Sequence, residues 1–204
     1  MKPLAGLLIS YLAGSIPFAY LAGKLFKGVD LREHGSGNLG ATNVFRVMGW
    51  KIASLVMVLD MAKGAIPVFL LPPRLAHTHT ELWAIAFGVA AIVGHVRSAF
   101  LMWKGGGKGV ATAGGVFLAL APLASLISIT VFAIVVYLSG YVSVGSLCSA
   151  VALTVAVVIM KGVSSPIAIA CAVITVFVFW THRANIGRLR RGEENRFRRA
   201  RPAT

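Results

Sequence analysis

Charged residues are scarce in this chain, and acidic residues most of all. Only 13% of the 204 residues are charged, and six acidic residues stand against twenty lysines and arginines. With 57% apolar residues and a mean hydropathy of +0.82, the chain has too little polar surface to cover a soluble globular domain. The composition therefore predicts an integral membrane protein.

The sequence also has few residues that could form a metal or thiol site. It lacks an Asp-rich box, an HExxH pattern and a Cys/His set. Its two cysteines, Cys148 and Cys171, lie inside apolar runs, where a thiol is most simply a small apolar side chain. We therefore assign no chemistry to the cysteines, no metal and no cofactor.

Seven apolar stretches alternate with short polar segments. We expect membrane-spanning helices near residues 4–25, 52–72, 82–101, 110–121, 123–139, 144–160 and 165–181. The first stretch lacks the polar region and cleavage site of a signal peptide, so we interpret it as a span. The fourth and fifth are divided at Ala121-Pro122, because proline is favourable at the start of a helix and removes a hydrogen bond inside one. A single kinked helix there is the alternative.

These stretches predict an all-α, polytopic membrane fold of about seven transmembrane helices with glycine-rich cytoplasmic loops. We expect one transmembrane domain over residues 1–192 and a basic cytoplasmic tail over residues 193–204. With seven spans, sixteen lysines and arginines fall on one face and three on the other, with Lys63 inside the membrane. Since these residues are retained on the cytoplasmic side of short loops, the N-terminus is expected outside and the C-terminus in the cytoplasm.

The net charge of +14 is concentrated after the last apolar stretch, where eight arginines lie between Arg183 and Arg201. We expect membrane lipid as the partner of this segment and no nucleic acid, since no aromatic interleaving accompanies the charge. For the tail itself we favour simple topological anchoring over a specific lipid-binding role. A monomer is the default expectation.

The first polar motif is GSGNLGATN at residues 35–43, which leads into a short helix expected over residues 39–48. Ser36 and Asn38 are competent helix N-caps, and the flanking glycines let the backbone approach a ligand closely. Thr42 and Asn43 precede Arg46 by one helical turn, so a hydroxyl, an amide and a guanidinium share a face. This combination favours anion binding; a glycine-rich turn with an ordinary cap is the alternative.

The second motif, KGGGKGVAT at residues 104–112, resembles a phosphate loop in composition. Three glycines precede Lys108, and a helix is expected to begin near Val110, so amides, a helix dipole and a lysine would suit a phosphate. It is not a Walker A loop, because that pattern needs Ser or Thr after the lysine, where this chain has Gly109. A hinge or close helix packing is the alternative.

The third motif, HRANIGR at residues 182–188, follows the last apolar stretch. His182 and Asn185 lie along one helical face, and arginines flank them. His182 could act as a base, an anion ligand or a membrane-interface residue. Asn185 needs partners for both its oxygen and its nitrogen if it faces the interior of the bundle.

Three ionisable residues lie within the apolar stretches or at their ends. Asp60 and Lys63 are about one turn apart, and intramembrane charges usually pair. They form either a structural pair or part of a proton-handling system. His95, at the end of the third stretch, either supports the second motif through hydrogen bonds or contacts substrate.

Two glycine loops and several cations, without a carboxylate cluster, are what phosphate-bearing substrates need. None of the five histidines has Asp five positions later, so the dyad of the thioester-using glycerolipid acyltransferases is missing. Taken together, the motifs closely resemble those of the acyl-phosphate:glycerol-3-phosphate acyltransferases of the PlsY family. GSGNLGATNVFR, GGKGVAT and THRANIGRLRRGEE carry the resemblance, supported by DxxKG at residues 60–64 and GH at residues 94–95.

The resemblance implies a seven-span bacterial inner-membrane enzyme with no metal or cofactor. It would transfer a fatty acyl group from acyl phosphate to the 1-hydroxyl of sn-glycerol 3-phosphate, giving lysophosphatidic acid and phosphate. The implied catalytic residues are Ser36, Arg46, Lys108, His182 and Asn185, and the implied substrate-binding residues are Gly37, Asn38, Thr42, Asn43, Gly106 and Gly107.

Several alternatives remain within this interpretation. Either glycine loop could hold the donor phosphate, and either the departing phosphate or His182 could take the hydroxyl proton. The segment VRSAFLMWKGGGKG lacks the family's usual proline and has a third glycine, Gly105, so either pair of glycine amides could face the phosphate. A transporter of a phosphorylated metabolite is the rival class, although the chain has no convincing inverted repeat.

Overall fold

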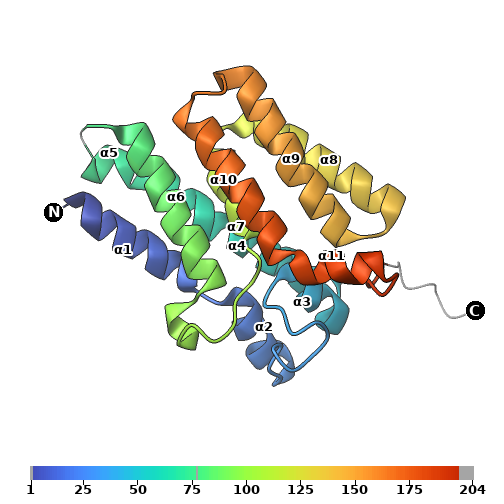
Figure 1. Ribbon diagram of the computed structural model, residues 1–204. Helices are drawn as coiled ribbons and strands as arrows, with labels where there is room; N and C mark the ends of the chain where they lie inside the picture. The colour runs from blue at the N-terminus through green and yellow to red at the C-terminus, as the bar shows by residue number, and fades with distance from the viewer. Residues whose placement is uncertain (1, 77, 198–204) are drawn as a thin grey trace, which may run out of the picture. The chain divides into compact units, whose positions relative to one another are not determined.

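The computed structural model describes residues 2–76 and 78–197, and these residues form helices and loops without a strand (Figure 1). The helices are α1 (Lys2–Ser15), α2 (Phe18–Lys27), α3 (Ala41–Met48), α4 (Trp50–Leu70), α5 (Pro72–Leu75), α6 (Thr80–Val96), η1 (Ala99–Leu101), α7 (Val110–Leu120), α8 (Pro122–Ser139), α9 (Val142–Lys161), α10 (Pro166–Thr181) and α11 (Arg183–Arg190). The all-α expectation is confirmed.

Each of the seven expected spans coincides with a helix or a pair of helices. Five segments are long and apolar enough to cross a membrane: Lys2–Lys27, Trp50–Leu75, Thr80–Leu101, Pro122–Ser139 and Val142–Lys161. The pair α10 and α11, bent by 55° at its junction, makes a sixth, and α7 is a shorter apolar helix of 11 residues. The protein is therefore a polytopic membrane protein, with five or six helices that meet the length of a span among the described residues.

Proline determines two of the helix boundaries. α7 ends at Leu120 and α8 begins at Pro122, so the division expected at Ala121-Pro122 is confirmed. The first span, expected to run unbroken over residues 4–25, is interrupted at Ile16-Pro17, where α1 ends and α2 begins. Pro17 has no N–H to continue the hydrogen bonds of α1, which explains the break.

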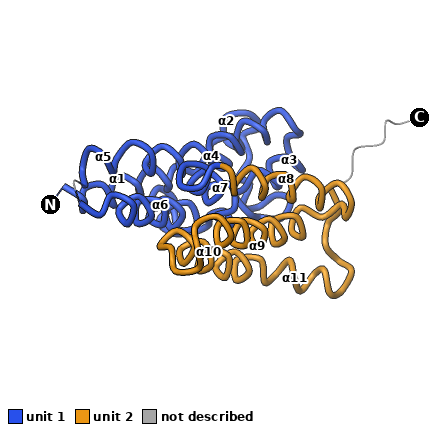
Figure 2. The backbone as a smooth tube through the Cα atoms, turned by 90° about the horizontal axis from the view of Figure 1, so that it is seen from above, with its two compact units in different colours: residues 1–122 blue, residues 123–204 orange. Residues whose placement is uncertain are grey.

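The chain forms two compact units, residues 1–122 and residues 123–204 (Figure 2). Unit 1 contains the helices from α1 to α7, and unit 2 contains those from α8 to α11. A single transmembrane domain ending at residue 192 stays a prediction.

Unit 1 is held together by close approach of helices at glycines. α1 packs chiefly against α6, and α4 against α7. A Cβ atom on Gly94 of α6 would collide with the Tyr11 carbonyl of α1, and one on Gly64 of α4 with the Thr112 carbonyl of α7. In a membrane, where burying apolar surface gives little driving force, such small residues let helices gain van der Waals contact.

Unit 2 relies more on hydroxyl groups between its helices. Ser128 of α8 donates to the Ser149 carbonyl of α9 at 2.8 Å, and Thr154 of α9 pairs with Thr175 of α10 at 2.8 Å. These hydroxyls are thus paired with a backbone carbonyl or with each other between the helices, where water is excluded.

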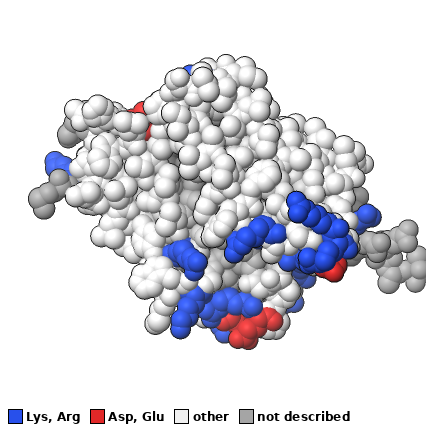
Figure 3. Space-filling view, viewed as in Figure 1, with Lys and Arg blue, Asp and Glu red and all other residues white. Residues whose placement is uncertain are grey.

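The outer surface is largely apolar, as contact with lipid tails requires. Most of the surface visible in Figure 3 carries neither basic nor acidic side chains. Large apolar residues such as Phe69, Ile159 and Val176 are more than two-thirds exposed, with 73%, 78% and 71% of their surface accessible. Exposure on this scale would be unfavourable in water and is expected against lipid tails.

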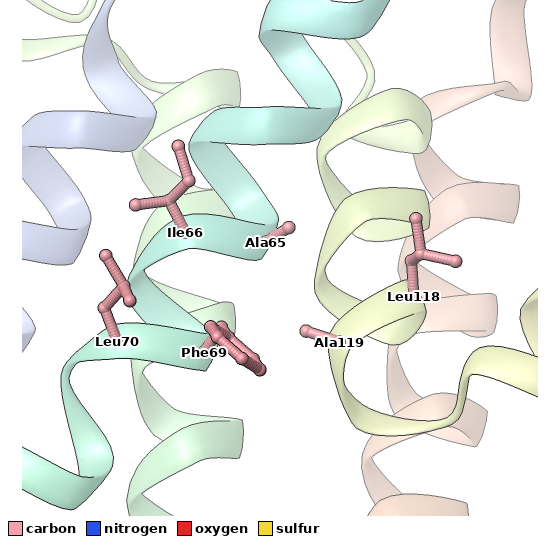
Figure 4. A pocket seen from close by; sticks show the side chains of 6 residues that line it. All are labelled: Ala65, Ile66, Phe69, Leu70, Leu118 and Ala119. Atoms are coloured by element: carbon pink, nitrogen blue, oxygen red, sulfur yellow. The ribbon is translucent and has the colours of Figure 1, made fainter.

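An apolar pocket of about 320 Å³ opens between α4 and α7 (Figure 4). It is lined by Ala65, Ile66, Phe69, Leu70, Leu118 and Ala119. These residues lie toward the C-terminal ends of α4 and α7, whereas the glycine-rich motifs precede the N-terminal ends of α3 and α7. The pocket thus lies at the C-terminal end of α7, whereas the second glycine-rich motif lies at the N-terminal end of the same helix.

The tight contact of α7 with α4 can be tested with two adjacent glycines. A Cβ atom on Gly115 would collide with the Met61 backbone, whereas one on Gly114 would meet no atom within 4 Å. Gly115→Ala should lower the free energy of unfolding by about 1–3 kcal/mol through overpacking. Gly114→Ala should raise it by about 0.5–1 kcal/mol, because alanine favours the helix. Thermal unfolding in detergent measures both, and equal effects of the two variants would contradict this packing.

Candidate functional site

The first glycine-rich segment forms a compact loop between α2 and α3. Gly28, with φ of 68°, ends α2 in the left-handed conformation. Arg32 pairs with Asp30 at 2.6 Å, and the hydrogen bonds that Arg32 donates lower the pKa of Asp30 to about 2. This carboxylate is therefore ionised at neutral pH and forms an ion pair with Arg32.

Asn43 organises this loop from the first turn of α3. Its side-chain oxygen accepts the Ser36 backbone N–H at 2.8 Å, and its nitrogen donates to the carbonyls of Leu31 at 3.1 Å and His34 at 2.9 Å. The side chain is 1% exposed, and a Cβ atom on Gly35 would collide with its oxygen. The amide assigned to substrate binding thus fixes the shape of the loop.

The other residues of the first motif lie around this amide. Ser36 and Arg46 are exposed, while Gly37, Asn38 and Thr42 are partly buried. The capping expectation was wrong: α3 begins at Ala41, Gly40 stands at its N-cap, and no side chain caps it. The backbone N–H of Ser36 turns instead toward Asn43, because the amide offers it a buried acceptor.

The second glycine-rich segment lies against the C-terminal end of α6. The Gly107 N–H donates to the His95 carbonyl at 3.3 Å. A Cβ atom on Gly107 would collide with the His95 ring, and one on Gly106 with the Val96 carbonyl. These two positions therefore admit only glycine, whereas Gly105, with φ of 98°, is exposed and serves the turn.

The structure brings the first two motifs together within unit 1. The Leu39 N–H donates to the Gly106 carbonyl at 3.3 Å, and the Arg32 guanidinium donates to the Lys104 carbonyl at 3.3 Å. Lys108 is partly buried and is followed by Gly109, which with φ of 84° stands at the N-cap of α7. The amides at the start of α7, the loop amides and the lysine therefore lie in one short segment, and anion binding by them stays a prediction.

In unit 2, His182 lies at the bend between α10 and α11. It is 3% exposed, and its Nδ1 lies 2.8 Å from the Val178 carbonyl. Because a carbonyl only accepts, Nδ1 carries the proton of this hydrogen bond. In the neutral imidazole, Nε2 is then the basic nitrogen.

Sequence reasoning gave no role to Glu194, the last residue of THRANIGRLRRGEE. Its carboxylate accepts from Asn185 Nδ2 at 2.6 Å and from Arg188 Nε at 2.7 Å. Burial raises the pKa of Glu194, but the hydrogen bonds from Asn185 and Arg188 outweigh that effect and leave the pKa below its usual range. One sequence signal could have identified Glu194. Acidic residues are rare in this chain, which has six, and two of them follow Gly192 directly, where the backbone makes a left-handed turn.

The segment after Glu194 folds onto the turn between α8 and α9. The Phe197 N–H donates to the Gly140 carbonyl at 2.6 Å, and Arg196 Nε donates to the Tyr141 hydroxyl at 3.0 Å. The first part of the predicted basic tail is therefore packed against the α8–α9 turn within unit 2. Residues 198–204 of that tail lie outside the described residues.

The described residues contain no group of three or more His, Cys, Asp and Glu side chains that could hold a metal ion. The two loops of unit 1 offer amides, hydroxyls and cations, and the third motif of unit 2 offers an imidazole and an amide. Such groups bind and orient oxyanions and supply hydrogen-bond donors to developing negative charge.

Asn43→Asp tests whether the amide shapes the first loop. The substitution keeps the size of the side chain but replaces two donors with a carboxylate facing the Leu31 and His34 carbonyls. We expect a loss of about 2–4 kcal/mol in the free energy of unfolding, because buried polar groups lose their partners. Thermal unfolding measures it, and Asn195→Asp, at an exposed position, is the control. A stable Asn43→Asp variant would rule out this role.

Glu194→Gln tests the contact with Asn185 and Arg188. The neutral amide weakens the charge-assisted hydrogen bond from Arg188, so we expect the unfolding temperature to fall by several degrees. Glu193→Gln is the matched control, since the adjacent glutamate pairs with Arg191 on the surface, where both side chains are more than half exposed. Equal effects of the two substitutions would argue against the buried cluster.

The sequence matches the family model described as glycerol-3-phosphate acyltransferase over residues 4–192. The glycerol-3-phosphate acyltransferase of Maridesulfovibrio salexigens is 44% identical over 193 residues, which cover 95% of this chain and 96% of that protein. The enzyme of that name from Anaeromyxobacter dehalogenans is 46% identical over 187 residues, covering 91% of this chain and 92% of the relative.

Solved structures agree with the sequence relatives. The crystal structure of PlsY, an integral membrane glycerol 3-phosphate acyltransferase, in its glycerol 3-phosphate form superposes with a TM-score of 0.89 at 35% identity, covering 97% of this chain and 96% of that one. Its lysophosphatidic acid form gives a TM-score of 0.85 at 34% identity, covering 96% and 95%. From the motifs, the fold and these relatives it follows that the chain belongs to the glycerol-3-phosphate acyltransferase family and is an integral membrane enzyme of the PlsY type.

Proposed function

We propose that this enzyme transfers a fatty acyl group from acyl phosphate to the 1-hydroxyl of sn-glycerol 3-phosphate. The products are lysophosphatidic acid and phosphate, in the first acylation of phospholipid synthesis. The observation that carries the proposal is the joining of two glycine loops in unit 1, next to Lys108 and the N-terminus of α7. The glycerol 3-phosphate and lysophosphatidic acid forms of the related PlsY structure support the acceptor and the product.

The two substrates each carry a phosphate, and the two loops provide two sets of groups for them. Lys108 with the amides of Gly106 and Gly107 would hold one phosphate, and Arg46 with Ser36, Gly37, Asn38 and Thr42 would hold the other. Asn43 would contribute by fixing the loop that presents Ser36. Both assignments of donor and acceptor to the loops are compatible with this chemistry.

The reaction itself needs no enzyme nucleophile, because acyl phosphate is an activated mixed anhydride. The acceptor hydroxyl oxygen attacks the carbonyl carbon, the bond between that carbon and the phosphate oxygen breaks, and phosphate leaves. Orientation of both reactants supplies most of the rate, and donors aimed at the oxyanion add about 3 kcal/mol each.

The proton of the attacking hydroxyl can pass to the departing phosphate, which is the route we favour. His182 is the alternative acceptor through Nε2, because its Nδ1 proton is engaged by Val178. Asn185, held by Glu194, would orient substrate or His182. The assignment of His182 and Asn185 to this reaction rests on their motif.

The excess of cationic residues in the loops and the tail supports a cytoplasmic location for the polar motifs and an N-terminus outside. A bacterial inner membrane is the corresponding location, with the acyl chain entering between helices from the inner leaflet. Membrane lipid is the expected partner, nucleic acid is not, and a monomer would suffice.

The donor is tested with protein purified in detergent. Lysophosphatidic acid formation from labelled glycerol 3-phosphate should occur with palmitoyl phosphate and not with palmitoyl coenzyme A. Product from the thioester alone would overturn the donor assignment, and no product from either with folded protein would overturn the proposed reaction.

In the same assay, Lys108→Met should reduce activity at least about a hundredfold without changing the unfolding temperature, because one phosphate loses its cation. Lys104→Met, four residues earlier at an exposed position of the same loop, is the matched control and should retain activity. Retained activity in Lys108→Met would remove the phosphate-loop assignment.

A further inference from the structure

A buried cluster of ionisable side chains lies next to the second glycine loop, and the reaction proposed above does not use it. Asp60 and Lys63 belong to α4, and His95 belongs to α6. Their accessible fractions are 2%, 6% and 7%. Burying charged groups among membrane helices costs free energy, so such groups are usually paired and often have a functional role.

Lys63 connects this cluster to the break in the first span. Its Nζ lies 2.7 Å from Asp60 Oδ1 and donates to the Ile16 carbonyl at 2.8 Å. It also lies 5.4 Å from the centroid of the Phe18 ring. Lys63 thus satisfies a backbone carbonyl between α1 and α2 and compensates the charge of Asp60.

Asp60 also faces His95. His95 Nδ1 lies 3.6 Å from Asp60 Oδ1. Neither of these two buried atoms has a partner that meets full hydrogen-bond geometry among the described residues. Because buried polar atoms are almost always paired, the carboxylate is the group placed to fix the orientation of the imidazole.

The imidazole in turn forms one wall of the second loop. The Gly107 N–H donates to the His95 carbonyl, and His95 Nε2 lies so close to Gly107 that no Cβ atom could be accommodated there. Lys108 follows directly in the chain. The orientation of the His95 ring therefore limits where Gly107, and with it Lys108, can lie.

We propose that Asp60 is a positioning residue for the second glycine loop: it fixes the imidazole of His95, and the imidazole fixes Gly107 and Lys108 for phosphate binding. The proposal rests on the proposed role of this loop in holding a substrate phosphate. Lys63 neutralises Asp60 and supports the α1–α2 break, but it does not contribute to positioning His95.

Two uncharged double variants separate positioning from charge balance. Single substitutions would leave a buried charge without its partner and could unfold the protein. Asp60→Leu/Lys63→Met removes both charges and the carboxylate oxygen that faces His95. Asp60→Asn/Lys63→Met also removes both charges but keeps an oxygen that can accept from His95 Nδ1. Replacing a buried ion pair in this way is often neutral for stability.

We expect both double variants to fold with similar unfolding temperatures. The Asn variant should retain most of the wild-type activity. The Leu variant should lose about tenfold to a hundredfold in kcat/KM, through a higher KM for the one phosphate substrate that the second loop holds. Equal activity of the two variants, whether both high or both low, would overturn the proposal.

A second measurement does not depend on catalysis. In protein labelled with ¹⁵N-glycine, the Gly107 amide resonance should shift in the Leu variant and stay near its wild-type position in the Asn variant. An unchanged Gly107 resonance in the Leu variant would overturn the proposal. If the wild-type protein forms no lysophosphatidic acid, the proposed reaction fails, while this resonance still decides whether Asp60 positions the loop.

Discussion

The contact between the second glycine loop and the end of α6 is the constraint on which the candidate site in unit 1 depends. Gly106 lies against the backbone of His95 and Val96, and Gly107 lies against the His95 ring, with no room for a side chain at either position. This contact fixes where α7 begins, and α7 then packs on α4 through Gly115. The first loop joins the same assembly through the bond from Leu39 to Gly106.

Acidic residues are few, and four of the six form ion pairs with basic residues. Asp30 pairs with Arg32, Asp60 with Lys63, Glu193 with Arg191 and Glu194 with Arg188. The last of these also binds Asn185. The carboxylates of this enzyme thus organise loops and helices, and six carboxylates cannot neutralise twenty lysines and arginines.

The sequence predicted well what local chemistry decides. Apolar runs predicted the helices, Pro122 predicted the start of α8, and the glycine motifs predicted loops before α3 and α7. It could not predict partners that only tertiary structure provides. The three backbone partners of Asn43 lie 7 to 12 residues away in the chain, and Glu194 reaches Asn185 across the turn at Gly192. The break at Pro17 was missed because an apolar run obscures a single interruption.

The way Asn43 holds the first loop has a consequence for how this protein can vary among relatives. Within the described part of the chain, its amide bonds only to main-chain atoms, those of Leu31, His34 and Ser36. Side chains at these positions can therefore change without disturbing the bonds, because every residue offers the same carbonyl and, proline excepted, the same N–H. The number of residues between 31 and 43 cannot change so freely. Insertions and deletions, rather than substitutions, should be the rare events in this segment.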